Sequence, residues 1–310
     1  MARYIARRIA ISLVTIFVLI TATFFLLRLI PDGLFADPNI PEAARARLRA
    51  HYGLDRPVIE QYFIYLRNLL RMDMGYSIAF PGRQITTMII DPATGNGLPQ
   101  SMRLGASALV VSITMGLFLG SVAGLNRNKF WDKFTIGIAL IGVSMPSFVV
   151  ATLLITLFGN ILGILPTTGF SNIREMILPT ICLSLGTIAV IARMMRTSMI
   201  ELESADFIKT ARSKGLKKYK IVLKHQVRNA LLPVVTLLGP ISAVLLTGTF
   251  VVESIFNIRG LGGFFVESIA NRDHGLVMGL TVLFGTFLIV ANLIVDIIYG
   301  FIDPRIRLMK

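Results

Sequence analysis

Residues 9–27, IAISLVTIFVLITATFFLL, carry no charged side chain and form one continuous apolar run. A helix of this length can cross a hydrocarbon core of about 30 Å. Arg3, Arg7 and Arg8 precede the run, as in a signal peptide, but the run is too long for one and no small-x-small cleavage site follows it. The segment is therefore predicted to remain in the protein as a first transmembrane helix.

Five further segments pass the same test, and the composition of the chain agrees with them. The 310 residues are 54% hydrophobic and 15% charged, with a mean hydropathy of +0.73, so lipid is the expected solvent. We predict an all-α integral membrane protein with a single transmembrane domain over residues 1–310. Its six spans are expected at about 9–30, 103–126, 134–158, 177–197, 229–252 and 275–299, the fourth extending beyond Arg193.

The formal net charge of +14 is distributed unevenly among the loops. The N-terminus, residues 127–133, residues 193–228 and the C-terminus are rich in Lys and Arg, and six spans place all four on one side. The positive-inside rule makes that side cytoplasmic, which predicts a multi-pass protein with both termini in the cytoplasm. The rule also accounts for the basic excess, so nucleic acid is not expected as a partner.

The predicted extracytoplasmic loop at 31–101 is too long to be only a connector. A helix start at Pro41, and apolar residues at helical spacing from Val58 to Met72, predict that the loop is partly helical. Two roles remain open for it. It could be an amphipathic cap over the outer mouth, or a folded loop that makes no contact with substrate.

Motifs for chemistry within this chain are absent from the sequence. It has no G-x-x-x-x-G-K-[ST] phosphate loop, no H-E-x-x-H and no His, Asp or Ser constellation at catalytic spacing. The glycines at 260–263 follow a span rather than a strand, which favours loop flexibility or a tight turn over phosphate binding. Cys182 is the only cysteine and is expected to be a small core residue. No catalytic residue, no metal site and no substrate-binding residue is therefore predicted.

Ionisable side chains are almost absent from the predicted spans. Arg28, Glu253 and Asp296 lie near span ends, where snorkelling or a local ion pair is the expected arrangement. An ion-coupled secondary transporter usually needs an ionisable group near the membrane midplane. The sequence therefore disfavours that class.

The predicted cytoplasmic loop at 198–228 contains a segment with helical character, ELESADFIKTARSKGL at 201–216. Its acidic residues precede its basic ones, which suits a helix macrodipole, and Gly215 is a natural left-handed cap. Phe207, Ile208, Ala211 and Leu216 can form an apolar stripe that another protein or the rest of the bundle must cover. The segment is predicted to be a short rigid helix that a partner protein could bind.

The run DFIKTARSKGL at 206–216 resembles the EAA-type loop of the permeases of bacterial ABC importers, and the match continues through His225 and RNALLP at 228–233. Lys209-Thr210-Ala211 stands where the general pattern has Glu-Ala-Ala, and the distance from Gly215 to Pro233 is longer than in that pattern. Both departures are typical of the dipeptide, oligopeptide and nickel subgroup. Further matches are RLIP at 28–31, YGLDRP at 52–57, QY at 61–62, DMGYS at 73–77, PSF at 146–148, GLG at 260–262 and DPR at 303–305.

The resemblance implies a type I ABC importer permease fold in a bacterial cell membrane, as the first of two related permeases. It implies as partners a second permease, two ATPase subunits that hold ATP and Mg, an extracytoplasmic solute-binding protein and a peptide substrate. This chain itself is then expected to bind no cofactor. The loop helix would be a coupling helix docked on the ATPase, with contacts expected from Glu201, Asp206, Phe207, Thr210, Ala211, Arg212, Lys214, Gly215 and Leu216.

Three alternatives remain beside the peptide permease. An importer of nickel or another small solute belongs to the same subgroup, and the sequence of the binding protein would separate the two. A secondary transporter is disfavoured by its missing midplane charges. An intramembrane enzyme ranks last, because no catalytic constellation supports it.

Overall fold

The computed structural model describes residues 2–29, 46–47, 50, 53–80, 82–90 and 95–302. The helix start expected at Pro41 and the basic residues of the C-terminus lie outside these ranges. Within them the fold is helical, and β structure is limited to isolated bridges such as that between Gly97 and Gly260. The all-α prediction is therefore confirmed for the described residues.

Five helical stretches are long and apolar enough to cross a membrane, or six if one bent pair counts as a single span. The long helices are α1 (Ala2–Arg28), α5 (Leu98–Leu125), α8 (Ile173–Glu203), α11 (Arg228–Leu246) and α14 (His274–Ile302). The shorter helices are α3 (Val58–Leu69), α4 (Ile85–Ile89), α6 (Phe130–Ser144), α7 (Ser147–Leu154), α9 (Asp206–Ser213), α10 (Lys218–Lys220), α12 (Phe250–Ile255) and α13 (Leu261–Ala270), with π-helices η2 (Ile155–Ile161) and η3 (Ile221–Val227). As expected, α8 continues past Arg193.

The third predicted span, 134–158, is not one helix. It divides into α6 and the α7–η2 segment, which meet at an angle of 110°. Pro146 has no N–H to donate and disfavours the helical conformation at the residue before it, and Met145 is accordingly extended, with φ −90° and ψ 125°. The 15 residues of α6 extend about 22 Å, so α6 alone is shorter than a hydrocarbon core.

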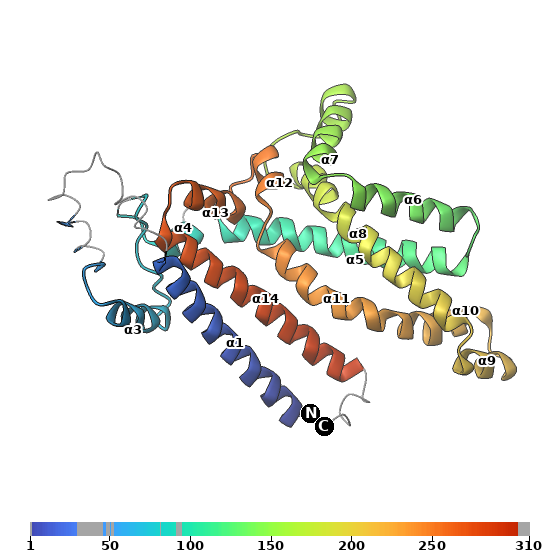
Figure 1. The fold of residues 1–310 in the computed structure, drawn as a ribbon. Coiled ribbons are helices and arrows are strands. Elements are labelled where there is room, and N and C mark those ends of the chain that lie inside the picture. The colour runs from blue at the N-terminus through green and yellow to red at the C-terminus, as the bar shows by residue number, and fades with distance from the viewer. Residues whose placement is uncertain are drawn as a thin grey trace.

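The centre of the bundle is the contact between α5 and α8, with α11 beside both (Figure 1). Gly116, Gly120 and Gly124 recur every four residues on α5 and face α8. A Cβ at Gly120 would lie 2.5 Å from the carbonyl oxygen of Ala192, so only glycine permits this approach. Small residues at such spacing are the usual basis of close helix packing in lipid.

A second contact joins α14 to α11 on one side and to α1 on the other, so that the first and last helices lie side by side (Figure 1). Arg8 of α1 forms an ion pair of 2.9 Å with Asp296 of α14. The local ion pair expected for Asp296 is therefore confirmed.

The described residues between α1 and α5 pack on the C-terminal end of α1 and the N-terminal end of α14. Helix α3 buries Tyr62 and Tyr65 against Phe24 of α1 and Val282 of α14. It ends three residues before the predicted limit at Met72, whose φ of 60° is left-handed. Helical structure is thus confirmed in this part of the loop, and its contacts lie at one edge of the bundle.

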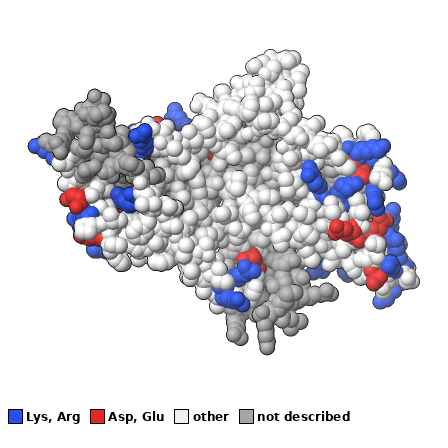
Figure 2. Space-filling view, viewed as in Figure 1, with Lys and Arg blue, Asp and Glu red and all other residues white. Residues whose placement is uncertain are grey.

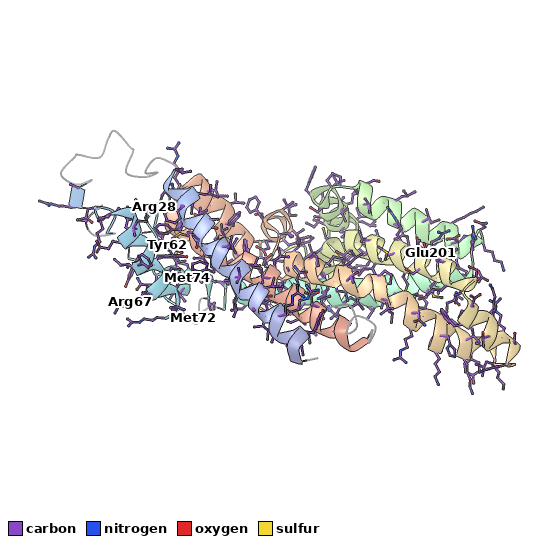
Figure 3. All side chains as sticks on the ribbon, turned by 60° about the horizontal axis from the view of Figure 1, so that its bottom comes forward. Arg28, Tyr62, Arg67, Met72, Met74 and Glu201 are labelled. Atoms are coloured by element: carbon purple, nitrogen blue, oxygen red, sulfur yellow. The ribbon has the colours of Figure 1, made fainter. Side chains whose placement is uncertain are left out.

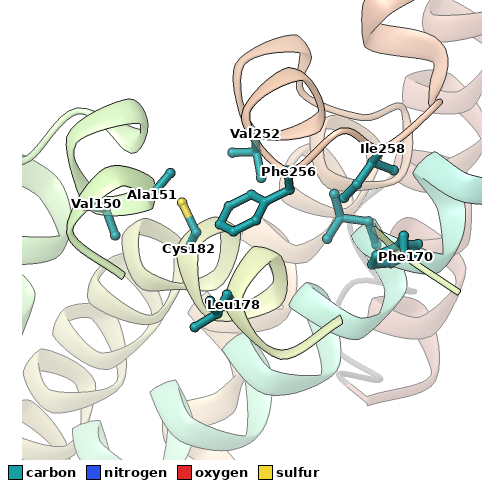
Figure 4. Close-up of a cluster of buried hydrophobic side chains, with 9 residues drawn as sticks. Val150, Ala151, Phe170, Leu178, Cys182, Val252, Phe256 and Ile258 are labelled. Atoms are coloured by element: carbon teal, nitrogen blue, oxygen red, sulfur yellow. The ribbon is translucent and has the colours of Figure 1, made fainter. Parts of the chain in front are cut away.

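A buried cluster joins α7, α8 and α12 (Figure 4). Phe256 and Leu178 are fully buried in it, and Cys182 is 4% exposed. The thiol donates to the backbone carbonyl of Ser147 at 3.3 Å. Cys182 is therefore the small core residue that the sequence predicts.

Charged side chains gather in patches, most of them at the two ends of the molecule, and a broad uncharged band lies between these ends (Figure 2). The apolar surface of this band belongs to the long helices and to α6 and α7. The 18-residue windows that define the spans of α1 and α14 are only 11% and 6% buried within the chain. Such exposed apolar area is expected where lipid or another membrane subunit covers a protein.

Candidate functional site

The predicted helix in the 198–228 loop is α9, and its C-terminal cap is a Schellman motif. Gly215 has φ +71°, its N–H donates to the carbonyl of Arg212 at 2.9 Å, and the N–H of Leu216 donates to the carbonyl of Ala211 at 3.3 Å. This is the hydrogen-bond pattern of a left-handed glycine cap. The cap predicted at Gly215 is confirmed.

The apolar residues of α9 divide between two faces. Ile208 and Ala211 are buried, at 0% and 5% exposure, against Ile221 of the same chain. Phe207 and Leu216 remain 41% and 39% exposed. The chain itself therefore covers Ile208 and Ala211 of the predicted stripe and leaves Phe207 and Leu216 exposed.

The loop is attached to the bundle by a buried hydrogen bond. Gln226, on the π-helix η3, donates from its amide to the backbone carbonyl of Met199 on α8 at 2.7 Å. A weaker contact of 3.9 Å joins Arg212 to Glu203 at the end of α8. Because η3 continues directly into α11, a force on α9 can be transmitted to both α8 and α11.

The structure places most of the predicted contact residues on one exposed end of the molecule. Glu201 lies in the last turns of α8, at the end that carries the loop (Figure 3), and every residue from 212 to 220 is exposed. Asp206, Phe207 and Thr210 are also exposed on α9, whereas Ala211 is buried beneath it. Ala211 therefore supports the helix from inside and is not available to a partner.

An ion pair beside this site was missed from the sequence. Asp132, at the start of α6, is 1% exposed and accepts two hydrogen bonds from the guanidinium of Arg196 on α8, the one from Nη2 at 2.8 Å. The backbone N–H of Asn128 donates to the same carboxylate at 2.7 Å. The signal in the sequence that could have indicated this ion pair is a single acidic residue, Asp132, within a basic loop. The pair fixes the 127–133 loop to the helix that carries α9.

We expect Arg196→Met to lower the free energy of unfolding by about 3 kcal/mol, because it leaves the buried carboxylate of Asp132 without its cation. Thermal or denaturant unfolding of the purified protein in detergent measures this. Lys133→Met, which removes an exposed cation from the same end of α6, is the control. The double variant Asp132→Asn/Arg196→Met should recover much of the loss, and a loss no larger than that of Lys133→Met would contradict the expectation.

The opposite end of the molecule contains a buried carboxylate for which the sequence prediction is wrong. Glu253 of α12 neither snorkels nor forms an ion pair among the described residues, and it is 1% exposed. Its carboxylate accepts from the hydroxyl of Ser101 at 2.6 Å and from the N–H of Gly262 at 2.9 Å. Hydrogen bonds thus satisfy a buried polar group that burial alone would strongly disfavour.

The glycine-rich segment at 260–263 packs against this carboxylate. A Cβ at Gly260 would lie 2.4 Å from the hydroxyl of Ser101 and 2.5 Å from the carboxyl of Glu253. The same hydroxyl accepts from the N–H of Leu261 at 2.8 Å. Gly260 is extended and precedes α13, and Gly262 and Gly263 lie in the first turn of that helix, so the tight turn predicted for these glycines is not formed. The network joins α5, α12 and α13.

Metal-binding clusters are not present in the part of the chain that the structure describes: no group of three or more His, Cys, Asp or Glu side chains comes together there.

Comparison with known proteins gives the family. The model of the binding-protein-dependent transport system inner membrane component matches residues 116–308. The chain belongs to this family of permeases. An N-terminal model of the same systems matches residues 1–80 of the permease.

Full-length relatives agree with this assignment. The permease is 43% identical over 311 residues to the dipeptide transport system permease protein DppB of Bacillus subtilis, covering 100% of this chain and 99% of that protein. It is 42% identical to the oligopeptide transport system permease protein OppB of Haemophilus influenzae and 40% identical to OppB of Escherichia coli, in both cases over 310 residues and covering 99% of this chain and 100% of the relative.

The fold is also found in a solved transporter. An inward-facing structure of the MetNI methionine ABC transporter superposes with a TM-score of 0.55 at 17% identity, covering 67% of this chain and 94% of that one. The permease thus has the type I ABC importer permease fold expected from the sequence. It is an integral inner-membrane component of a transport system rather than an enzyme.

Proposed function

We propose that this permease forms part of the membrane pathway of an ATP-binding-cassette importer that carries di- or oligopeptides into the cell. The observation that carries the proposal is its 40–43% identity, over the full chain, to dipeptide and oligopeptide transport system permeases. The capped, exposed helix α9 supports a mechanism in which energy enters mechanically from outside the chain.

The ATPase contact is assigned to the exposed face of α9 and the turn after it. Phe207 and Leu216 supply the apolar centre of this surface, and the basic residues after Gly215 surround it. ATP and Mg are then held by separate ATPase subunits, two per transporter. Closure of the ATPases would push α9 as a rigid body and move α8 and α11 with it.

The proposed orientation places α9 and both termini in the cytoplasm. The concentration of Lys and Arg between residues 193 and 228 supports this through the positive-inside rule. The end that carries Glu253, α3 and α13 then faces outward, toward a solute-binding protein. A second, homologous permease would cover part of the exposed apolar surface and complete the pathway.

The test is to tag this chain, extract it gently from its native membrane and identify the co-purifying proteins by mass spectrometry. Two ATPases, a second permease and a binding protein that contains peptide are the expected result. A binding protein that contains nickel would move the assignment to the metal importers of the subgroup. Recovery of the chain alone, active in vesicles without ATP, would overturn the importer assignment.

The same purification tests the contact surface. We expect Phe207→Ala to weaken ATPase binding about 30-fold, because a central aromatic anchor contributes about 2 kcal/mol. Trp131→Ala removes another exposed aromatic side chain, from α6 outside this surface, and should leave the ATPases bound. Equal ATPase recovery with both variants would show that α9 is not the contact.

A further inference from the structure

A cavity of about 370 Å³ lies where α3 packs on the outer end of α1, beside Met278 of α14. Its walls combine apolar side chains such as Phe24 with the polar side chains of Arg28, Arg56, Gln61 and Tyr65. We call it the Tyr65 cavity. Figure 3 shows Arg28 and Tyr62 together at this end of the molecule, far from Glu201.

Two buried polar atoms of the cavity walls have no hydrogen-bond partner within the described part of the chain. They are the hydroxyl of Tyr65, a residue only 9% exposed, and Oε1 of Gln61. The neighbouring Tyr62, in contrast, shares a hydrogen bond of 2.7 Å with the hydroxyl of Thr21. Burial of an unsatisfied hydroxyl is unfavourable and usually indicates a bound water or ligand.

The donors of the cavity suit an anion. Burial raises the pKa of Tyr65 to about 12, so its hydroxyl stays protonated and can donate. Arg56 and Arg28 add guanidinium groups, which match the geometry of phosphate oxygens. Arg56 directs one N–H toward Glu60 at 2.9 Å, and its guanidinium has further N–H donors. With Glu60 paired to Arg56, the two arginines leave one net positive charge beside the buried phenol, which matches the single negative charge of a phosphodiester.

The surroundings of the cavity indicate which phosphate would bind. Leu26 and Leu29, near Arg28, are 62% and 80% exposed, and only 11% of the membrane-crossing window of α1 is buried within the chain. The cavity thus adjoins both a polar outer surface and a long apolar face. A free phosphate ion would contact only the polar surface, whereas a phospholipid contacts the polar surface with its headgroup and the apolar face with its acyl chains.

We propose that the Tyr65 cavity binds the phosphate headgroup of a membrane glycerophospholipid, whose acyl chains lie along the exposed face of α1. Tyr65 donates to a phosphate oxygen, and the guanidinium groups of Arg28 and Arg56 neutralise its charge. Gln61 Oε1 accepts from a hydroxyl or ammonium of the headgroup. The lipid thereby fixes α3 to the outer ends of α1 and α14.

The test uses the purified complete transporter in detergent, with lipids that remain bound counted by native mass spectrometry. Wild type should retain one more phospholipid than Tyr65→Phe or the double variant Arg28→Gln/Arg56→Gln. The controls are Tyr62→Phe, whose hydroxyl already has a partner, and Arg67→Gln, an exposed arginine of α3 outside the cavity. Both controls should retain the wild-type number.

Titration separates the possible sources of phosphate. Added phosphatidylglycerol should raise the unfolding temperature of wild type by mass action, and Tyr65→Phe should need about tenfold more lipid for the same rise. Without lipid, Tyr65→Phe should be at least as stable as wild type, because it removes an unsatisfied hydroxyl. Equal lipid retention and equal titration by Tyr65→Phe and wild type would overturn the proposal, as would full stabilisation by inorganic phosphate or by a substrate peptide.

Discussion

Replacing Gly105 by valine is expected to lower the free energy of unfolding by about 3 kcal/mol and to reduce strongly the amount of protein in the membrane. Gly105 lies on α5 directly against the backbone of α11. A Cβ there would lie 2.0 Å from the carbonyl oxygen of Leu245 and 2.5 Å from its carbonyl carbon. Because both clashing groups are backbone, no rotamer change relieves the overlap and the helices must separate.

The control for this prediction is Gly137→Val. Gly137 also lies within an apolar helix, α6, but a Cβ there would meet no atom within 4 Å. The two variants therefore add the same side chain and differ only in the space available. Unfolding in detergent and the level in membranes measure both, and equal stability of the two would show that α5 and α11 do not pack this closely.

Replacing Gly215 by valine is expected to reduce ATP-driven uptake at least tenfold while leaving the protein inserted in the membrane. A Cβ at Gly215 would meet no atom within 4 Å, so the variant creates no overlap. Its effect comes from the φ of +71°, which a β-branched residue resists by about 1–2 kcal/mol. Losing the Schellman cap would change the shape of the surface assigned to the ATPase contact.

The matched variant is Gly215→Asn, because asparagine tolerates the left-handed conformation. Uptake should be largely retained with asparagine and lost with valine, at similar membrane levels. ATP hydrolysis that continues in the valine variant without uptake would identify uncoupling rather than loss of the loop. Normal uptake with valine would contradict a coupling role for the cap.

Properties encoded in consecutive residues could be predicted from the sequence. The hydropathy of residues 9–27 predicts α1, because a helix in lipid satisfies its own backbone and needs only an apolar surface. Gly215 predicts the end of α9, because a left-handed residue without a Cβ terminates a helix locally. The family resemblance rested on such short motifs too, since each of them forms a turn or a helix end from its own residues.

Features formed by distant residues could not be predicted in this way. Ser101 and Glu253 are 152 positions apart. In the sequence Glu253 is an ordinary charged residue at a span end, and only the fold brings the hydroxyl of Ser101 beside it. Likewise, the composition of α9 predicts an apolar stripe, but only the fold places Ile221 over half of it. Hydropathy and turn chemistry act along the chain, whereas burial, hydrogen-bond satisfaction and close helix approach depend on which segments meet in three dimensions.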